Sequence, residues 1–587
     1  MNKIKTFLLK RHVQTIIASL VVFLAVWIVY VNSLGNKFLW DDQAGIVMNN
    51  YVHDLKYFLN FFSESMYAGK GVVCSYWRPL VLTVFALEWN TFLMWTGGYH
   101  MVNIALHAIN ALLVFFLFRA LFNRFFIAFL TALVFGIHPL NTEAITYISG
   151  IADPLCAMFV LLGTIAYVKA GKETRHQRKR LLLFSVFLSF ILALMSRESA
   201  IMMPGLLFLV DIFNKRSEIK KWRDIKIPLK TITPFLLFDG FYIILRLTIL
   251  DFTKWYFNSS FTHPLHERLF TFFHSFLIYL KLMFVPLHLH MEWIFPVDKT
   301  LFSTPVLAGG ILLALFIYLI FKTFKTIPEV SFGLAWFLIA LSPSMNILMP
   351  AAAPVAEHWL YISLSGFFFA LFVLIEKITS KCKYRWILLI FLTAWILWIS
   401  NITIIRNRDW TNATVLFTST LKESPDSARA NANLGLEYGK KREYDKAILY
   451  ITKATEIEPD NPLLFFFRAV IYEKMGKTAE SMRDHKRSMT IDVINTHSTD
   501  FLLNYYTRRN DYPKIREILE QVLEKTSSPI KSEETLLKLI SIAKAEKNDV
   551  LAEKYTKMRT EVQQGMQNDP IVKIGNFLNK YLGEPDS

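Results

Sequence analysis

Apolar runs of bilayer-spanning length recur along this chain from Gln14 to Ile405. A stretch of about 20 predominantly apolar residues is long enough to cross a bilayer as an α-helix. The chain is also 53% hydrophobic and only 19% charged, which is too apolar for disorder or for most soluble proteins of 587 residues. The sequence therefore predicts an all-α, polytopic membrane helical bundle.

The charge distribution divides the chain into parts. After Arg406 the sequence carries mixed charge and few apolar runs. We expect a transmembrane domain over residues 1–410, a connector over 411–427 and a soluble helical domain over 428–580. The formal net charge is +17, but the basic residues gather in short clusters between apolar runs. Membrane orientation explains such clusters better than nucleic-acid binding does, so no nucleic-acid partner is expected.

Three basic connections set the predicted topology. Lys169–Arg180 has six Lys or Arg, Asn214–Lys230 has seven and Lys377–Arg385 has four, so all three are expected in the cytoplasm with the N-terminus. This requires Leu80–Trp95 and Leu269–Pro286 to be interfacial helices. Eleven spans remain, and this odd number places the C-terminal domain outside. The predicted spans are 14–34, 103–121, 124–138, 152–169, 181–196, 199–213, 229–249, 304–322, 328–346, 358–376 and 385–405.

This topology places a set of polar residues on the outer face. Ionisable groups near bilayer depth are costly and usually face a protein cavity, so a converging set predicts a site. Loops are also where charge normally lies, and that simpler reading stays open for any single residue. The set comprises Trp40-Asp41-Asp42, Arg78, His138, Glu143, Asp153, Arg197-Glu198, Arg246, His288 to Glu292 and Glu357-His358.

The soluble domain shows a period of about 34 residues, which is typical of tetratricopeptide repeats. Small residues such as Gly435 and Ala447 let the two helices of a unit approach closely, and Pro459 ends the second helix. The first two repeats are predicted at 428–461 and 462–495, within an α-solenoid of three to four repeats. Such solenoids bind extended peptides in a groove but also serve as spacers, and peptide binding is the favoured reading.

Carboxylates and guanidinium groups suggest chemistry for the outer face. Asp41 or Asp42 can act as a general base toward a hydroxyl if apolar surroundings raise its pKa. Glu143 and Asp153 lie on the next outer loop as further acids. The residues expected to neutralise a phosphate leaving group are Arg78, Arg197 and Arg246.

Several loop sequences together resemble one family. They are Phe38-Leu39-Trp40-Asp41-Asp42, Trp77-Arg78-Pro79-Leu80, Tyr99-His100-Met101-Val102-Asn103 with His107, His138-Pro139-Leu140-Asn141-Thr142-Glu143-Ala144, Ala152-Asp153, Ser196-Arg197-Glu198, Leu245-Arg246-Leu247, Ala356-Glu357-His358-Trp359-Leu360-Tyr361 and Arg406-Asn407-Arg408-Asp409-Trp410. With the repeats, they resemble the transmembrane and tetratricopeptide-repeat-containing O-mannosyltransferases of the GT-C glycosyltransferase superfamily. The resemblance covers the chain from Leu20 to Asn495.

The resemblance implies a polytopic enzyme that moves a mannose-like sugar from a polyprenyl-phosphate carrier to Ser or Thr hydroxyls, usually with inversion. The acceptor is a protein or peptide on the extracytoplasmic side, and the membrane is a bacterial inner membrane or that of the endoplasmic reticulum. Asp41 is the expected base, with Asp42 or Glu143 in support. The donor phosphate is expected at Arg78, Arg197, Arg246 and His358, and further site residues are Asp153, Glu198, Glu357 and His138.

Some readings stay open beside this one. The chain has Ile151 and His358 where the family commonly has Arg. A polysaccharide ligase of the same bundle type and a non-enzymatic membrane scaffold are the alternative functions. His288, His290 and Glu292 alternate as metal ligands would in an extended segment, although incidental histidines in an aromatic loop are the favoured explanation. No cofactor is indicated with certainty, and a divalent metal stays an open alternative.

Overall fold

The computed structural model describes residues 2–216, 218, 226–250, 263–347, 353–380, 385–494, 497–526 and 528–568. The described residues form helices, turns and loops and contain no strand, so the predicted all-α class is confirmed. The chain divides into two compact units, Met1–Ser424 and Pro425–Ser587. Parts of two predicted cytoplasmic loops, 219–225 and 381–384, and the end of the predicted repeat domain, 569–580, lie outside the described residues.

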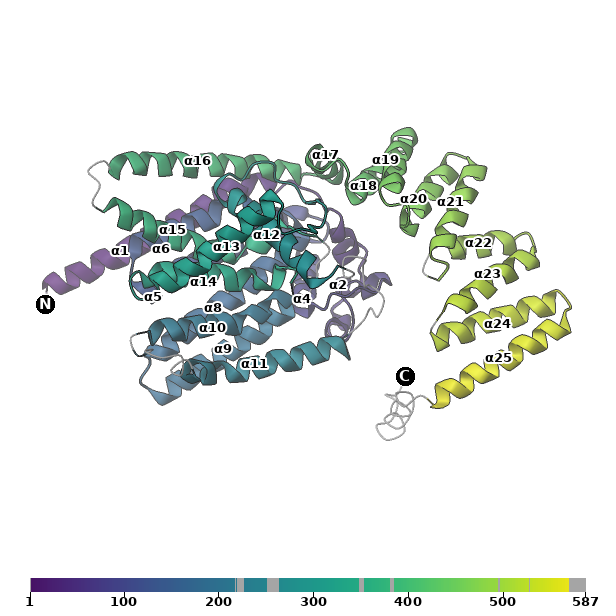
Figure 1. Ribbon diagram of the computed structural model, residues 1–587, viewed down its shortest axis with the longest axis horizontal. Helices are drawn as coiled ribbons and strands as arrows, with labels where there is room; N and C mark the ends of the chain where they lie inside the picture. The colour runs from purple at the N-terminus through teal and green to yellow at the C-terminus, as the bar shows by residue number, and fades with distance from the viewer. Residues whose placement is uncertain are drawn as a thin grey trace. The chain divides into compact units, whose positions relative to one another are not determined.

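The first unit is a bundle of long helices with short helices gathered at one end (Figure 1). Helix α1 runs beside α5, α6 and α16, and α8 packs against α5 and α9. The long helices are α1 (Asn2–Tyr30), α5 (Thr96–Phe122), α6 (Phe125–Ile137), α8 (Ala152–Lys172), α9 (His176–Ser196), α10 (Met203–Asn214), α11 (Lys226–Leu247), α12 (Leu265–Phe284), α13 (Thr304–Thr323), α14 (Pro328–Leu341), α15 (Ser363–Thr379) and α16 (Arg385–Asp409). The other helices of this unit are α2 (Asn50–His53), α3 (Asn60–Ser63), α4 (Pro79–Phe92), α7 (Thr142–Thr146) and α17 (Ala413–Glu423).

Six helices of the described residues are long and apolar enough to cross a membrane. A seventh is counted if α6 and the bent segment Pro139–Thr146, at 51° to it, form one broken span. The multi-pass character is thus confirmed, and the eleven-span count is not. Three predicted spans correspond to shorter helices: α10 has 12 residues, α14 has 14 and α15 has 17. A helix rises about 1.5 Å per residue, so these are short for a hydrocarbon core of about 30 Å.

Polar side chains on one face of α5 join the bundle to the short helices. His100, Asn103, His107 and Asn110 recur at helical spacing and are buried. Asn103 donates to the backbone carbonyls of Ile145, Tyr147 and Ile148, at the end of α7 and directly after it. His107 and Asn110 both contact the Tyr361 hydroxyl, at 2.6 and 3.2 Å. These contacts fix the loops that carry the predicted site against the bundle.

Buried asparagines fasten the end of α1 to the end of α16. The Asn407 amide nitrogen donates to the carbonyl of Val29 and to the Asn32 side chain, both at 2.7 Å. The Thr146 hydroxyl donates to the Asn407 amide oxygen at 2.8 Å. Asn36 then donates to the Asn407 carbonyl at 3.1 Å. The loop that follows α1 therefore leaves the bundle from a fixed point.

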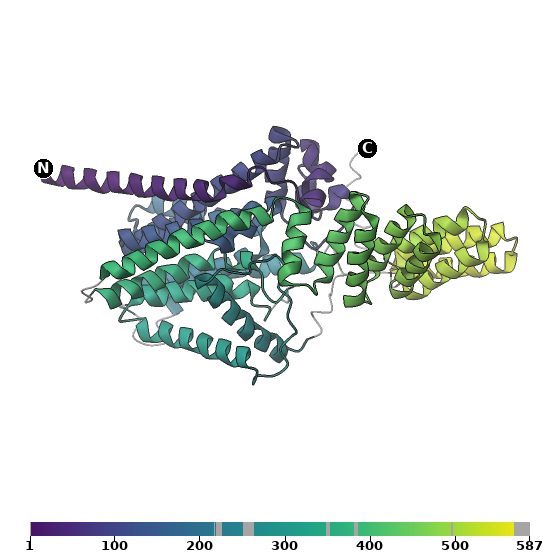
Figure 2. The ribbon, with the colours of Figure 1, turned by 90° about the horizontal axis from the view of Figure 1, so that it is seen from above.

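The second unit is a series of antiparallel helix pairs (Figure 2). In the first pair the Gly435 Cα lies so close to the partner helix that an added Cβ would be 2.9 Å from the Ala447 carbonyl oxygen. In the second pair a serine replaces the small apolar residue of the pattern, and Arg468 and Asp484 form a bidentate ion pair. Within the described residues there are four pairs: α18 (Ala428–Lys440) with α19 (Tyr444–Ile457), α20 (Pro462–Lys474) with α21 (Thr478–Ile491), α22 (His497–Thr507) with α23 (Tyr512–Lys525), and α24 (Pro529–Ala545) with α25 (Asp549–Asn568).

Candidate active site

The two adjacent aspartates of the loop that follows α1 have different environments. Trp40, directly before them, has φ of +38°, in the left-handed region that a bulky side chain rarely adopts. This turn directs Asp42 into the protein, where its side chain is fully buried, and leaves Asp41 half-buried. Unusual backbone of this kind is often found at functional sites.

Asp42 is held by three hydrogen bonds. Its Oδ2 accepts from the Leu39 amide at 2.7 Å, and its Oδ1 accepts from the Ser149 amide at 2.8 Å and the Ser149 hydroxyl at 2.5 Å. Burial raises the pKa of Asp42 to about 7, although these donors act in the opposite direction. Both carboxylate oxygens are thus occupied within the protein. Asp42 joins the loop that follows α1 to a second loop, which contains Ser149.

Asp41 lies beside aromatic hydroxyls. Its backbone amide donates to the Tyr147 hydroxyl at 3.0 Å. The Tyr147 ring stacks between Trp40 and Trp410, with centroids at 6.3 and 5.5 Å. Burial and then the charge of Asp41 raise the pKa of Tyr67, and burial and then Asp41 raise that of Tyr147, so both hydroxyls stay protonated. The charge of this carboxylate therefore acts on two neutral hydroxyls.

A group of arginines and acids lies next to this loop. Arg78 stands at the N-terminus of α4, and its Nη2 is 2.9 Å from Glu198 Oε2. Arg197 and Asp153 form a second ion pair. Arg197 has extended backbone at the break after α9, so it and Glu198 project to different sides and reach different partners. Burial acts to raise the pKa of Glu198, but Arg78 outweighs it and the pKa is lowered.

This arginine group is electrostatically continuous with the aspartate loop. The charge of Asp153 acts on Arg78, and the charges of both Asp41 and Arg78 act on the Tyr67 hydroxyl. The structure thus brings together the predicted residues Asp41, Asp42, Arg78, Asp153, Arg197, Glu198 and Arg246.

Arg246 differs from the other two arginines. Its guanidinium donates to the backbone carbonyls of Ser75 at 2.5 Å and Leu250 at 3.3 Å. No carboxylate of the described residues lies within ion-pair distance of it. Two of the three arginines therefore have acidic partners within ion-pair distance, whereas Arg246 has none among the described residues. A bound anion is the natural complement of such a group.

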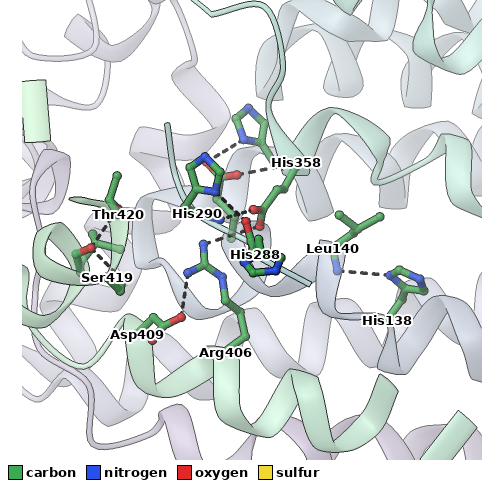
Figure 3. A network of polar contacts seen from close by, with 12 residues as sticks. His138, Leu140, His288, His290, His358, Arg406, Asp409, Ser419 and Thr420 are labelled. Carbon is green, nitrogen blue, oxygen red and sulfur yellow. Dashed lines mark hydrogen bonds and ion pairs between the residues drawn. The ribbon is translucent and has the colours of Figure 1, made fainter. Parts of the chain in front are cut away.

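The remaining predicted residues form a second group, around α16 (Figure 3). The His358 Nδ1 is 2.8 Å from Glu143 Oε1. Glu357 is fully buried and accepts from the His290 amide at 2.7 Å, with the Arg406 guanidinium 3.7 Å away. Figure 3 shows Arg406 directed toward Asp409, at 2.8 Å. Burial, partly offset by Arg406, raises the pKa of Glu357 to about 7.

His358 is thus paired with an acid in the second group. The sequence motif placed it with the arginines, and its role as a phosphate ligand stays a prediction. His138 is buried, and its two ring nitrogens contact the backbone of Met283 and Leu140 at 3.0 and 3.2 Å. It lies to one side of the group in Figure 3. These contacts fix a turn between α6 and α7.

The histidine-rich loop contributes to the second group through other contacts than metal ligation. His288 pairs with Glu423 at 3.0 Å. His290 stacks on Trp293, with centroids 4.2 Å apart. The described residues contain no group of three His, Cys, Asp or Glu side chains placed to hold a metal ion. These contacts agree with an aromatic loop that carries paired histidines.

Sequence reasoning missed several residues of the site. Tyr67 and Tyr147 were not singled out, although the charge of Asp41 acts on both hydroxyls. Ser149 was not expected to bind Asp42. Arg406 was noted only as part of a motif, yet it holds Glu357; a basic residue at the end of an apolar run was the available signal.

Comparisons with known proteins support the resemblance. Residues 428–461 match the family model described as Tetratricopeptide repeat. The chain is 25% identical to the Caenorhabditis elegans protein named Protein O-mannosyl-transferase F38B6.6 over 70% of this chain and 58% of the relative. For the human Protein O-mannosyl-transferase TMTC3 the identity is 23%, over 79% of this chain and 54% of the relative. For human TMTC4 it is 24%, over 74% and 65%.

These similarities cover between 70% and 79% of the chain. The predicted resemblance to transmembrane and tetratricopeptide-repeat-containing O-mannosyltransferases is thereby confirmed. The chain spans between 54% and 65% of the length of these three relatives.

Proposed function

We propose that this protein is a glycosyltransferase that moves a mannose-like sugar from a polyprenyl-phosphate carrier to Ser or Thr hydroxyls of proteins. The observation that carries the proposal is the contrast between Asp41 and Asp42 beside a group of arginines of which Arg246 has no acidic partner within ion-pair distance among the described residues. Asp42 is occupied by three donors, whereas Asp41 is half-buried and its charge acts on two neutral tyrosine hydroxyls. The names of the relatives add support for protein O-mannosylation.

In this proposal Asp41 is the general base. Its carboxylate removes the proton of the acceptor hydroxyl as the hydroxyl oxygen attacks the anomeric carbon of the sugar. The bond from that carbon to the phosphate oxygen breaks, and the lipid phosphate leaves. Attack on the face opposite the phosphate inverts the anomeric centre. Tyr67 and Tyr147 orient the acceptor by hydrogen bonding.

The arginine group receives the phosphate of the donor. A sugar linked through one phosphate to a polyprenol carries one negative charge. The charge of Arg246, which lacks an acidic partner within the described residues, matches that single charge. Guanidinium groups give directional, charge-assisted hydrogen bonds to phosphate oxygens. The polyprenyl tail lies in the bilayer along the apolar helices.

The proposed architecture is a GT-C-type bundle of eleven spans over residues 1–410 with the repeat domain outside. The three basic connections favour a cytoplasmic N-terminus. Glycosylation-acceptor tags inserted after Asp41 and after residue 460 should both be modified in cells. A tag in the Lys169–Arg180 loop should not be. Modification of that loop would contradict the topology and the shared outer face.

The direct test uses the purified full-length chain in detergent. Turnover of polyprenyl-phosphate mannose with a Ser/Thr-rich acceptor peptide should depend on Asp41, and Asp41→Asn should lose most of it. Arg246→Ala should raise the KM for the donor. Transfer at the unmodified rate by both variants would contradict the proposal. Transfer to glycan but to no peptide would favour the polysaccharide ligase, and no transfer with retained protein binding by the repeats would favour the scaffold.

The repeat domain is proposed to bind the acceptor protein. Its helix pairs and its match to a tetratricopeptide repeat suggest protein interaction. Acceptor peptides that bind this unit gain in local concentration at Asp41. The carrying membrane is a bacterial inner membrane or that of the endoplasmic reticulum, and no metal is required for the proposed proton transfer.

A further inference from the structure

Helix α11 carries buried polar groups that the proposed mechanism does not use. Asp239 and Tyr242 are 7% and 6% exposed and lie on the same face of the helix as Arg246. The opposite face, with Leu237, Phe241 and Ile244, is exposed and apolar. Buried polar groups in a membrane helix are costly and usually have a function.

Tyr242 faces the arginine group. Its ring packs on Trp77 with centroids 6.4 Å apart, and Arg246, about one turn along the helix, donates to the carbonyl of Ser75. The segment Ser75–Arg78 therefore runs along this face of α11. Arg78, at the end of that segment, holds Glu198 at 2.9 Å. The charges of Glu198, Arg246 and Arg78 all act on the Tyr242 hydroxyl.

Three buried polar atoms around this face of α11 form no hydrogen bond within the described residues. The Tyr242 hydroxyl and Glu198 Oε1 are the two that belong to the arginine group, and Asp239 Oδ1 lies one turn away along α11. A tyrosine hydroxyl donates a hydrogen bond, and a carboxylate oxygen only accepts one. A buried polar group without a partner is unfavourable, so a ligand that satisfies both atoms gains free energy on binding.

We propose that Tyr242 and Glu198 bind a hydroxyl group of the donor sugar. A sugar hydroxyl accepts from the Tyr242 hydroxyl and donates to Glu198 Oε1, which no phosphate oxygen can do because a phosphodiester has no proton to donate. The phosphate lies at Arg246, beside this pair. The site thus recognises the sugar separately from the lipid phosphate. This inference rests on the proposed function.

The test compares two ligands with the full-length chain in detergent. One is a short-chain polyprenyl-phosphate mannose, and the other is the same polyprenyl phosphate without sugar. Tyr242→Phe removes only the hydroxyl and keeps the ring against Trp77. Its affinity for the sugar-bearing ligand should fall about tenfold, and its affinity for the bare phosphate should stay unchanged. Arg246→Ala should weaken binding of both ligands.

A matched control lies one turn away. Asp239 is equally buried on the same face, but no charged side chain of the described residues acts on it. Asp239→Asn should leave the ratio of the two affinities unchanged. A sugar-selective loss in this variant as well would assign the effect to a disturbance of α11 and overturn the inference.

The remaining outcomes separate the inference from the proposed function. If Tyr242→Phe lowers the affinity for both ligands equally, or for neither, the proposed sugar site is wrong while the phosphate site stands. If the unmodified protein binds neither ligand, the proposed function and the inference both fail. Polyprenyl-phosphate sugars that each lack one hydroxyl identify the hydroxyl that Tyr242 binds. The analogue that lacks this hydroxyl should bind the unmodified protein and Tyr242→Phe with equal affinity.

Discussion

The contrast between Asp41 and Asp42 leads to a prediction in which stability and activity separate. The perturbation is the replacement of each aspartate by asparagine, one at a time. The amide keeps the size of the carboxylate but turns one acceptor oxygen into a donor. Asp42 uses both of its oxygens as acceptors, toward Leu39 on one side and Ser149 on the other. Asp42→Asn therefore cannot satisfy both sides.

The magnitude follows from those contacts. If the side-chain oxygen of the introduced asparagine faces Ser149, its side-chain nitrogen faces the Leu39 N–H, and that buried donor loses its acceptor. An unsatisfied buried group costs about 1–3 kcal/mol. We expect Asp42→Asn to lower the free energy of unfolding by about 2 kcal/mol. Asp41 is half-buried, so Asp41→Asn should change the free energy of unfolding by less than about 0.5 kcal/mol.

Transfer activity should show the opposite order. Loss of a general base typically costs a factor of about 10²–10⁴ in rate. Asp41→Asn should lose activity on that scale while its melting temperature in detergent is unchanged. Asp42→Asn should melt lower and, below its melting temperature, keep more activity than Asp41→Asn. A stable Asp42→Asn protein with the larger loss of kcat would refute the assignment of the base.

Three further predictions test the fold around the site. Burial raises the pKa of Asp42 from 3.8 to about 7, so the folded protein binds this proton more tightly than the unfolded chain does. The stabilisation from the bound proton is complete below about pH 4 and is lost as the pH rises to 7. The difference in melting temperature between the unmodified protein and Asp42→Asn should follow that trend. Arg406→Gln leaves Glu357 buried without its cation and should lower the free energy of unfolding by about 3–5 kcal/mol. The double variant with Glu357→Gln should recover part of this loss, and thermal melting of the solubilised variants measures both effects. Gly435→Ala should separate the helices of the first pair and increase hydrogen exchange of their amides. Gly476→Ala is the control, because its added Cβ meets no neighbouring atom and the variant tests only the effect of a positive φ.

The sequence predicted the class of fold well because periodicity and length are local properties. The all-α character and the first repeat follow directly from apolar runs and from residues such as Gly435. The number of spans could not be fixed in the same way. Helices α10 and α14 are short, so their sequences alone do not distinguish a full crossing from a helix that ends within the bundle.

The site was predicted as a set, but its internal division was not. Sequence placed Arg246 and His358 together because both are basic and both were expected on the outer face. The structure gives His358 an acidic partner and leaves Arg246 with backbone carbonyls. Ion pairing across hundreds of residues depends on how helices pack, and no local pattern records it.

Three pairs of adjacent polar residues show how the site is built. In each pair the two side chains diverge, as neighbouring side chains in extended or tightly turned backbone must. Asp42 binds the second loop while Asp41 stays half-buried, and Arg197 reaches Asp153 while Glu198 reaches Arg78. In the third pair Glu357 and His358 contact Arg406 and Glu143.

Adjacent polar residues at the end of a helix thus connect two different parts of the protein at once. One connection fixes the backbone, and the other side chain is held in place as a consequence. For this reason the loss of Asp42 should displace Asp41, and the loss of Arg197 should displace Glu198 from Arg78. Effects within a pair should therefore be non-additive, with double variants little worse than the more damaging single variant. Additive losses would mean that the two side chains act independently and that the pairing has no role in positioning.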